Sequence, residues 1–152
     1  AIVFSEFGLL NSGFDYSVFF FFFSTRMLKK GVNAIYAEER IAGIPLSLKK
    51  RYFLRSKDRT KKTVRVTPAL RRKVSFKRLN FMAASFDVYE TFDMIFCRNV
   101  LIYFDRETQE KVINKLCLKL KSGGYFFLGH SESIMNMNLP LKQVRPTVFR
   151  RI

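Results

Sequence analysis

Residues 92–105 read FDMIFCRNVLIYFD, a pattern typical of a strand that leads into a helix. Apart from Asp93, residues 92–97 form an apolar run, as in a buried strand, and polar Arg98 and Asn99 then interrupt it. In an open parallel sheet, ligands bind beyond the carboxyl ends of the strands. Because Arg98 and Asn99 lie at such an end, the sequence predicts a binding site there.

The helix that follows is the clearest element of the sequence. Asp105 is a good N-cap, and Glu107 lies in the first turn, where the helix dipole favours a negative charge. One apolar stripe comprises Val112, Ile113, Leu116, Cys117 and Leu120. We expect Gly123 or Gly124 to end the helix, and residues 125–130 to form the next strand.

Strand and helix patterns also alternate upstream. Residues 14–23 are rich in aromatic side chains and predict a buried strand, and residues 24–36 predict a helix that Ser24 or Thr25 can cap. Residues 74–80, VSFKRLN, alternate apolar and basic side chains, which predicts a half-exposed strand.

The middle of the chain predicts a small insertion. Pro45 begins a short helix, and two strand-like pieces within residues 51–67 flank KDRTKK, which predicts a hairpin with a cationic tip. Residues 68–73 predict a helical turn, and residues 147–152 a last strand. The order of strands and helices predicts an α/β fold, with a parallel sheet covered by helices.

Composition limits the classes of protein further. The 152 residues suggest one domain, and a net charge of +16 favours anionic partners: nucleic acid, an acidic lipid surface or acidic protein. Cys97 and Cys117 lie in apolar contexts, which predicts buried, reduced thiols in a cytoplasmic protein without a zinc site. The longest apolar run, residues 16–23, is far shorter than the ~20 residues of a membrane-spanning helix.

Three stretches carry a family resemblance. They are FDMIFCRNVLIYFDRETQEKVINKL, KSGGYFFLGHSES and LKQVRPTVFRRI. From about residue 14 to its end, the chain resembles the catalytic domain of CheR-type chemotaxis-receptor methyltransferases. The resemblance implies that residues 1–152 form part of a Rossmann-like, S-adenosylmethionine-dependent methyltransferase sheet, with a small antiparallel β hairpin subdomain inserted at about 51–67.

The same resemblance implies a function. The family transfers a methyl group from S-adenosylmethionine to glutamate side chains of bacterial chemoreceptors. The expected partners are the acidic cytoplasmic helices of methyl-accepting chemotaxis receptors, with no nucleic acid and no membrane insertion. The expected location is the cytoplasm.

The resemblance also implies roles for individual residues. Asn80 and Phe81 would border the adenine and ribose of the cofactor. Arg98 and Asn99 would lie against the methionine part and the transferring methyl group, and Tyr103 would position the incoming carboxylate. No metal is implied, and because a glutamate carboxylate is already a nucleophile at neutral pH, the reaction needs geometry rather than a strong base.

Other roles for the polar residues are simpler. Arg98 can pair with Asp93 or Asp105 and serve only the fold. His130, the one histidine, lies just past a strand; we expect a hydrogen-bonded turn residue near the site rather than a proton carrier. Ser131 and Glu132 have the same expected role.

The chain also departs from the family. Phe22 stands where the family has an aspartate that binds the ribose hydroxyls, and phenylalanine cannot accept those hydrogen bonds. Nothing at residues 1–13 resembles the family's glycine-bearing cofactor loop, which we expect to precede residue 1.

Two other functions compete with an active enzyme. One is a non-catalytic receptor-docking module or inactive fragment, which would hold the receptor through its basic surface and hairpin. Phe22 and the missing cofactor loop favour it, whereas Arg98, Asn99 and Tyr103 favour the enzyme. The other is a nucleic-acid methyltransferase, suggested by the charge. Enzymes of that kind commonly carry an Asn or Asp-Pro-Pro-aromatic turn at the strand end that holds CRNV here, and the chain has no such turn.

Overall fold

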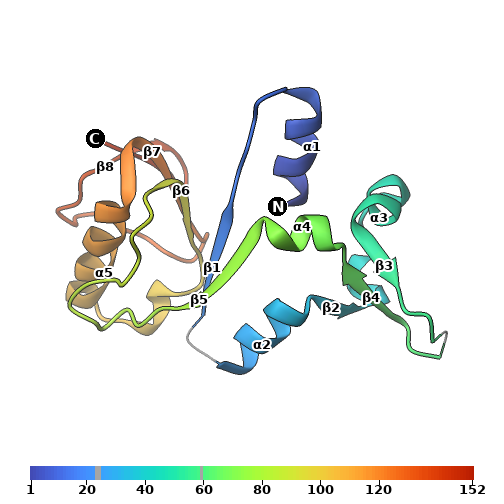
Figure 1. The fold of residues 1–152 in the computed structure, drawn as a ribbon. Helices are drawn as coiled ribbons and strands as arrows, with labels where there is room; N and C mark the ends of the chain where they lie inside the picture. Colours follow the sequence, from blue (N-terminus) through green and yellow to red (C-terminus); the bar gives the residue numbers. More distant parts are fainter. Residues whose placement is uncertain (23–24, 59) are drawn as a thin grey trace. The chain divides into compact units, whose positions relative to one another are not determined.

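The computed structural model describes residues 1–22, 25–58 and 60–152. The chain forms two compact units, Ala1–Leu79 and Asn80–Ile152. The first unit contains, in order, α1 (Ile2–Leu10), β1 (Val18–Phe22), α2 (Thr25–Asn33), β2 (Ile35–Ala37), a 3₁₀ turn (Glu38–Ile41), α3 (Leu46–Tyr52), β3 (Phe53–Arg55), β4 (Thr63–Val66), α4 (Pro68–Arg72) and β5 (Val74–Arg78) (Figure 1). The second unit contains β6 (Phe92–Cys97), a 3₁₀ turn (Leu101–Tyr103), α5 (Arg106–Lys119), β7 (Leu120–Leu128), β8 (Leu141–Arg145) and β9 (Val148–Arg151).

A parallel pair of strands, β1 and β5, forms one sheet of the first unit. Phe22 lies opposite Arg78, at the carboxyl ends of both strands. The predicted strand at 14–23 is confirmed only from Val18, and Phe23 lies outside the described residues. The prediction that this strand is buried is wrong for Phe20, which is 45% exposed.

The helix predicted over 24–36 is shorter than expected. α2 ends at Asn33, and Ala34 turns the chain with a φ of 52°. Ile35 and Tyr36 then pair with β4 in place of continuing the helix, because β-branched and aromatic side chains fit a sheet surface well. Ser24 lies outside the described residues, so the predicted cap stays a prediction.

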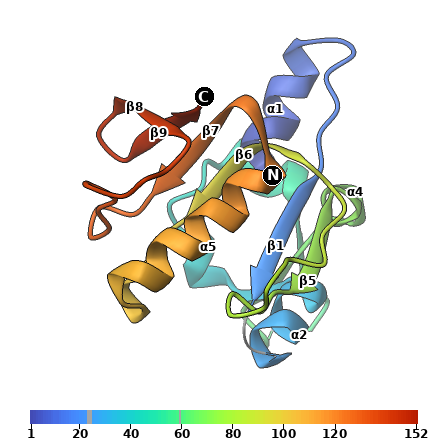
Figure 2. The same cartoon turned by 90° about the vertical axis from the view of Figure 1, so that its left-hand side faces the viewer.

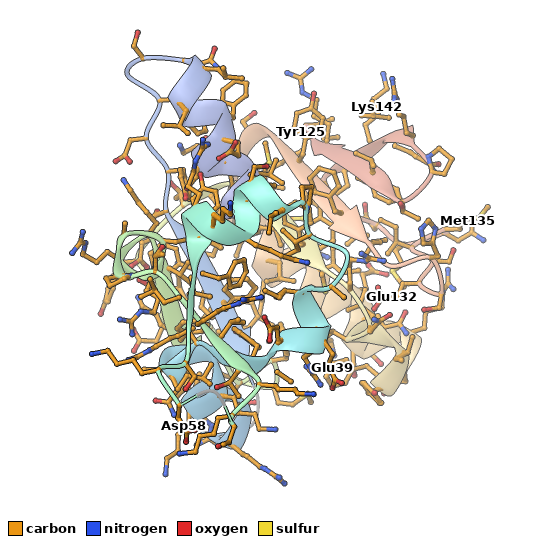
Figure 3. All side chains as sticks on the ribbon, turned by 90° about the vertical axis from the view of Figure 1, so that its right-hand side faces the viewer. Glu39, Asp58, Tyr125, Glu132, Met135 and Lys142 are labelled. Carbon is orange, nitrogen blue, oxygen red and sulfur yellow. The ribbon has the colours of Figure 1, made fainter. Side chains whose placement is uncertain are left out.

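The predicted hairpin is confirmed and has a third strand. β3 and β4 pair antiparallel, and β2 pairs with the other side of β4, giving the order β2-β4-β3. Asp58, labelled in Figure 3, lies in the turn between β3 and β4 and accepts hydrogen bonds from the Thr60 amide at 3.0 Å and the Thr60 hydroxyl at 2.6 Å. Lys61 is an exposed cation of the same tip. Arg59 lies outside the described residues.

A cluster of polar side chains joins α1 to α3. The Glu6 carboxylate accepts hydrogen bonds from Arg51 Nη1 at 2.7 Å and from the Tyr52 hydroxyl at 2.6 Å. These hydrogen bonds lower the pKa of Glu6, the one from Tyr52 most. Burial, followed by the contact with Glu6, raises the pKa of Tyr52.

The second unit is a four-stranded sheet with one helix across it (Figure 2). Its strand order is β6-β7-β9-β8: β6 and β7 are parallel with α5 between them in the chain, and the other pairs are antiparallel. Asp105 caps α5, since its carboxylate accepts the Thr108 amide at 2.9 Å, and the predicted apolar stripe is buried. These findings confirm the predicted α/β class.

Two predictions for this unit need correction. α5 ends before Gly123 and Gly124, because the chain turns at Leu120 directly into β7 and the glycines lie within that strand. Leu120 is fully buried, so burial of this side chain anchors the turn without a glycine cap. β8 was not predicted; it pairs with β9, and Thr147 between them has a φ of 61°.

Both cysteines are free and buried, as predicted. Within residues 1–22, 25–58 and 60–152, no helix has the length and apolar character that crossing a membrane requires.

Candidate functional site

In the second unit, the loops that follow β6 and β7 begin at the same edge of the sheet. Cys97, the last residue of β6, lies opposite Leu128, the last residue of β7, in a parallel register. The chain therefore continues into residues 98–101 and 129–132 side by side. This edge is the carboxyl end of both strands, where a parallel sheet of this kind binds ligands.

Glu132 joins the two loops. Its Oε1 accepts the backbone amides of Val100 and Leu101, each at 2.9 Å, and its Oε2 accepts the amide of Gly129 at 2.8 Å. The side chain is buried, with 9% exposed (Glu132 is labelled in Figure 3). The expectation of a hydrogen-bonded turn residue is confirmed for Glu132.

Asn99 has an unusual backbone conformation at this edge. Its φ is 57°, in the left-handed region, which asparagine tolerates better than most residues. A Cβ added to Gly129 would lie 3.4 Å from Asn99 Oδ1 and 2.7 Å from Glu132 Oε2. The two loops therefore approach so closely at Gly129 that only glycine fits without a shift.

Arg98 is exposed, and within the part of the chain that the structure describes it forms no ion pair. The carboxylate of Asp93 instead binds Lys121 at 2.8 Å, and that of Asp105 caps α5. The simpler expectation, that Arg98 pairs with Asp93 or Asp105, is therefore wrong. The guanidinium group is free to bind an anionic ligand.

Tyr103 lies on the 3₁₀ turn that follows and is 77% exposed. Gln109 of α5 holds this turn, because its Nε2 donates to the carbonyl oxygens of Leu101 at 3.0 Å and Phe104 at 2.9 Å. Gln109 was not among the site residues predicted from the sequence. A signal was present, since Gln109 lies three and four residues before Val112 and Ile113, on the apolar stripe of the helix.

Asn80 and Phe81 begin the second unit. The Asn80 side chain accepts the Met82 amide at 3.0 Å, in a local turn on the surface. Phe81 is buried, and its ring contacts Phe86 and Phe104 edge to face at 5.8 and 6.4 Å. Phe81 is therefore part of the support beneath the 3₁₀ turn.

Cys97 and His130 are two further polar residues near this edge. Burial, with a smaller effect of the Glu132 charge, raises the pKa of Cys97 to about 12, so the thiol is not a nucleophile at neutral pH. His130 is exposed in the turn after β7. Among the described residues, no three His, Cys, Asp or Glu side chains are grouped so as to hold a metal ion.

The chain matches the family described as CheR methyltransferase, SAM binding domain, over residues 1–149. It is 36% identical to chemotaxis protein methyltransferase 2 of Pseudomonas aeruginosa over 125 residues, covering 82% of this chain and 45% of that protein. It is 37% identical to the chemotaxis protein methyltransferase of Borreliella burgdorferi over 128 residues, covering 84% of this chain and 44% of that protein.

A solved structure, the glycopeptide N-methyltransferase MtfA with S-adenosylmethionine, aligns with 96% of this chain and 47% of its own, at 16% identity and a TM-score of 0.44. The match covers less than half the length of each of the two chemotaxis protein methyltransferases.

The family match and the α/β fold define a methyltransferase-type domain. The chain belongs to the CheR methyltransferase family, as its S-adenosylmethionine-binding domain. This membership and the parallel β6-α5-β7 unit confirm the predicted Rossmann-like class and the predicted cofactor.

The polar residues at the carboxyl end of β6 have the chemistry to bind part of that cofactor. The methionine end of S-adenosylmethionine carries a carboxylate, and Arg98 offers an exposed guanidinium that has no ion pair with any residue described by the structure. Asn99 is exposed beside it and offers both a donor and an acceptor. The role predicted for Phe22 concerns a side chain outside the structural description, and it stays a prediction.

Proposed function

We propose that this chain is the cofactor-binding part of a protein-glutamate O-methyltransferase that modifies bacterial chemoreceptors. One observation carries the proposal most: Arg98 and Asn99 lie exposed at the carboxyl end of β6, and Arg98 has no ion pair among the described residues. The chemotaxis methyltransferases to which the chain is similar support the choice of reaction.

Each residue has a defined task in this proposal. Arg98 binds and orients the carboxylate at the methionine end of the cofactor through paired hydrogen bonds, and Asn99 hydrogen-bonds to neighbouring polar atoms of the cofactor. The bound cofactor supplies a methyl group on a positively charged sulfur. Tyr103, on its exposed turn, orients the incoming glutamate carboxylate. No residue has to remove a proton, because the carboxylate is already a nucleophile.

Transfer of labelled methyl groups to receptor cytoplasmic fragments tests this function. The assay uses the longest translation product that contains residues 1–152 and counts base-labile methyl esters. Arg98→Ala should lower transfer by roughly 100-fold or more, since misplacing a reacting group costs about that much. Its unfolding midpoint should stay close to that of the wild type, because Arg98 is exposed. Wild-type turnover in Arg98→Ala would contradict the proposal.

The proposed partner is an acidic surface of the receptor's cytoplasmic helices. The β3-β4 turn supports this choice, since Lys57, Lys61 and Lys62 are exposed there. Opposite charges across an interface raise association rates more than they raise affinity. A docking module without catalysis is the alternative, and the methyl ester assay distinguishes the two.

A further inference from the structure

Glu132 is a buried acidic side chain that, among the residues described by the structure, hydrogen-bonds only to backbone amides. Its two carboxylate oxygens accept three amides at 2.8–2.9 Å, two from the loop after β6 and one from the loop after β7. Hydrogen bonds to an ionisable group are stronger than neutral ones, and a buried amide that loses its partner costs about 1–3 kcal/mol.

We infer that Glu132 is a positioning residue of the cofactor edge, an inference that rests on the proposed function. The amides of Val100 and Leu101 follow Arg98 and Asn99 directly, so the carboxylate fixes the backbone that aims those two side chains. Because the other oxygen holds Gly129, the loops of β6 and β7 move together. Glu132 acts through Arg98 and Asn99 and does not touch the reacting atoms.

A second contact fixes the same segment from the helix side. Gln109 donates to the carbonyl oxygens of Leu101 and Phe104, whereas Glu132 accepts the amides of Val100 and Leu101. Glu132 therefore holds the segment 100–104 at the amides of its first two residues, and Gln109 holds it at two of its carbonyl oxygens. This arrangement lets Tyr103 be exposed on a turn with a fixed backbone.

The close approach at Gly129 is an independent sign that the joint is tight. A Cβ added to Gly129 would lie 2.7 Å from Glu132 Oε2, which is shorter than the contacts that Cβ atoms make with non-bonded atoms in proteins. Gly129→Ala should therefore displace the carboxylate while leaving Glu132 in the sequence.

Glu132→Gln tests the inference with almost no change in volume. An amide side chain has one acceptor oxygen, whereas the carboxylate uses two. If the glutamine oxygen keeps Val100 and Leu101, its NH₂ group faces the Gly129 amide, and if it turns over, it faces the other two. One loop must therefore be released in either orientation.

Asp105→Asn is the matched control. Asp105 also accepts a backbone amide, that of Thr108 at 2.9 Å, but it holds only the start of α5. Loss of a carboxylate could weaken S-adenosylmethionine binding merely by lowering the stability of the fold. In that case, Asp105→Asn would weaken binding as much as Glu132→Gln when both variants lose the same free energy of unfolding.

Two readouts are needed: amide exchange by NMR, and S-adenosylmethionine affinity by calorimetry. In Glu132→Gln and Gly129→Ala, we expect faster exchange at residues 98–101 or 129–132, with the amides of α5 still protected. We expect affinity to fall about tenfold or more, since a loop ordered only part of the time lowers apparent affinity in proportion. Asp105→Asn should keep wild-type affinity.

Unchanged exchange in both loops, or wild-type affinity in Glu132→Gln despite a released loop, would overturn the inference. The proposed function fails separately, if the wild-type protein does not bind S-adenosylmethionine. In that case, faster loop exchange in Glu132→Gln still supports Glu132 as the residue that positions Arg98 and Asn99.

Discussion

The ammonium group of Lys115, on α5, donates a hydrogen bond of 2.6 Å to the backbone carbonyl oxygen of Phe81. It donates a second, also of 2.6 Å, to the carbonyl of Ala83, and it lies 5.0 Å from the centre of the Phe86 ring. The segment that follows Asn80 is therefore fastened to the same helix that supports the 3₁₀ turn of Tyr103.

Lys115→Met should destabilise the second unit by about 1.5–3 kcal/mol, the usual value of a hydrogen bond to a charged group. Methionine keeps most of the apolar stem and removes the donors. Urea unfolding measures the change. Lys111→Met is the control on the same helix, because Lys111 makes an exposed pair with Glu107, and such pairs contribute little. Equal losses in both variants would contradict this role of Lys115.

Cys97 and Cys117 should resist alkylation in the folded protein. Burial raises the pKa of Cys97 to about 12 and that of Cys117 to about 11, from an ordinary value of 9.0. The stabilisation linked to these thiols is complete below pH 9.0 and is lost as pH rises through the folded values. Mass spectrometry after iodoacetamide treatment at pH 8 should find both thiols unmodified until urea is added. Rapid labelling without urea would mean that the thiols are accessible.

Stability of the first unit should depend on Glu6 in a pH-sensitive way. Hydrogen bonds from Tyr52 and Arg51 lower the pKa of Glu6 below its ordinary 4.5. The stabilisation is therefore present above pH 4.5 and is lost as pH falls through the lower folded value. Glu6→Gln should be less stable than the wild type at pH 7, and thermal unfolding curves of the two should converge in acid. If the difference in unfolding temperature between the two proteins stays constant across this pH range, the ionised carboxylate is not the cause of the difference in stability.

The cationic turn of the hairpin should govern association with an acidic receptor surface. The test variant changes Lys57, Arg59, Lys61 and Lys62 to Gln. The control removes the same charge elsewhere, by changing Arg72, Lys119, Lys142 and Arg145 to Gln. The turn variant should associate more slowly, with a weaker dependence on salt, because steering by charge is screened. Surface plasmon resonance measures both rates.

If association keeps its rate and salt slope in the turn variant, the hairpin must act in another way. The open edges of β2 and β3 would then be the sites for adding a strand from the partner, since β4 is paired on both sides. Lysine near a strand edge usually discourages such pairing.

The sequence predicted the elements that have strong local signals. β6 and α5 follow from an apolar run and from the Asp105 cap, and both are observed. β2 and β8 were not predicted, for two different reasons. β2 has only three residues and lies within a helical pattern, whereas β8 is mostly exposed, so neither carries an apolar run of its own.

The position of the candidate site could be predicted from the sequence, whereas most of the contacts that hold its loops could not. Arg98 and Asn99 stand out as polar residues after an apolar strand, and strand ends meet at one edge of a sheet. Gln109 lies on the apolar stripe of α5, which indicates that its side chain faces inward. Which backbone carbonyls Gln109 and Lys115 reach depends on the fold and could not be predicted from the sequence. Glu132 was expected only as a turn residue, because its contacts with Val100 and Leu101 depend on the parallel register of β6 and β7.

A titration of the isotope-labelled chain with S-adenosylmethionine, followed in its amide NMR spectrum, addresses the cofactor edge itself. We predict saturable shifts at residues 98–101 and 129–132, with no comparable shifts on β8 and β9, and loss of the response in Arg98→Ala. Saturable binding that shifts other residues and leaves these two loops unchanged, or binding that Arg98→Ala does not weaken, would contradict the assignment of the site.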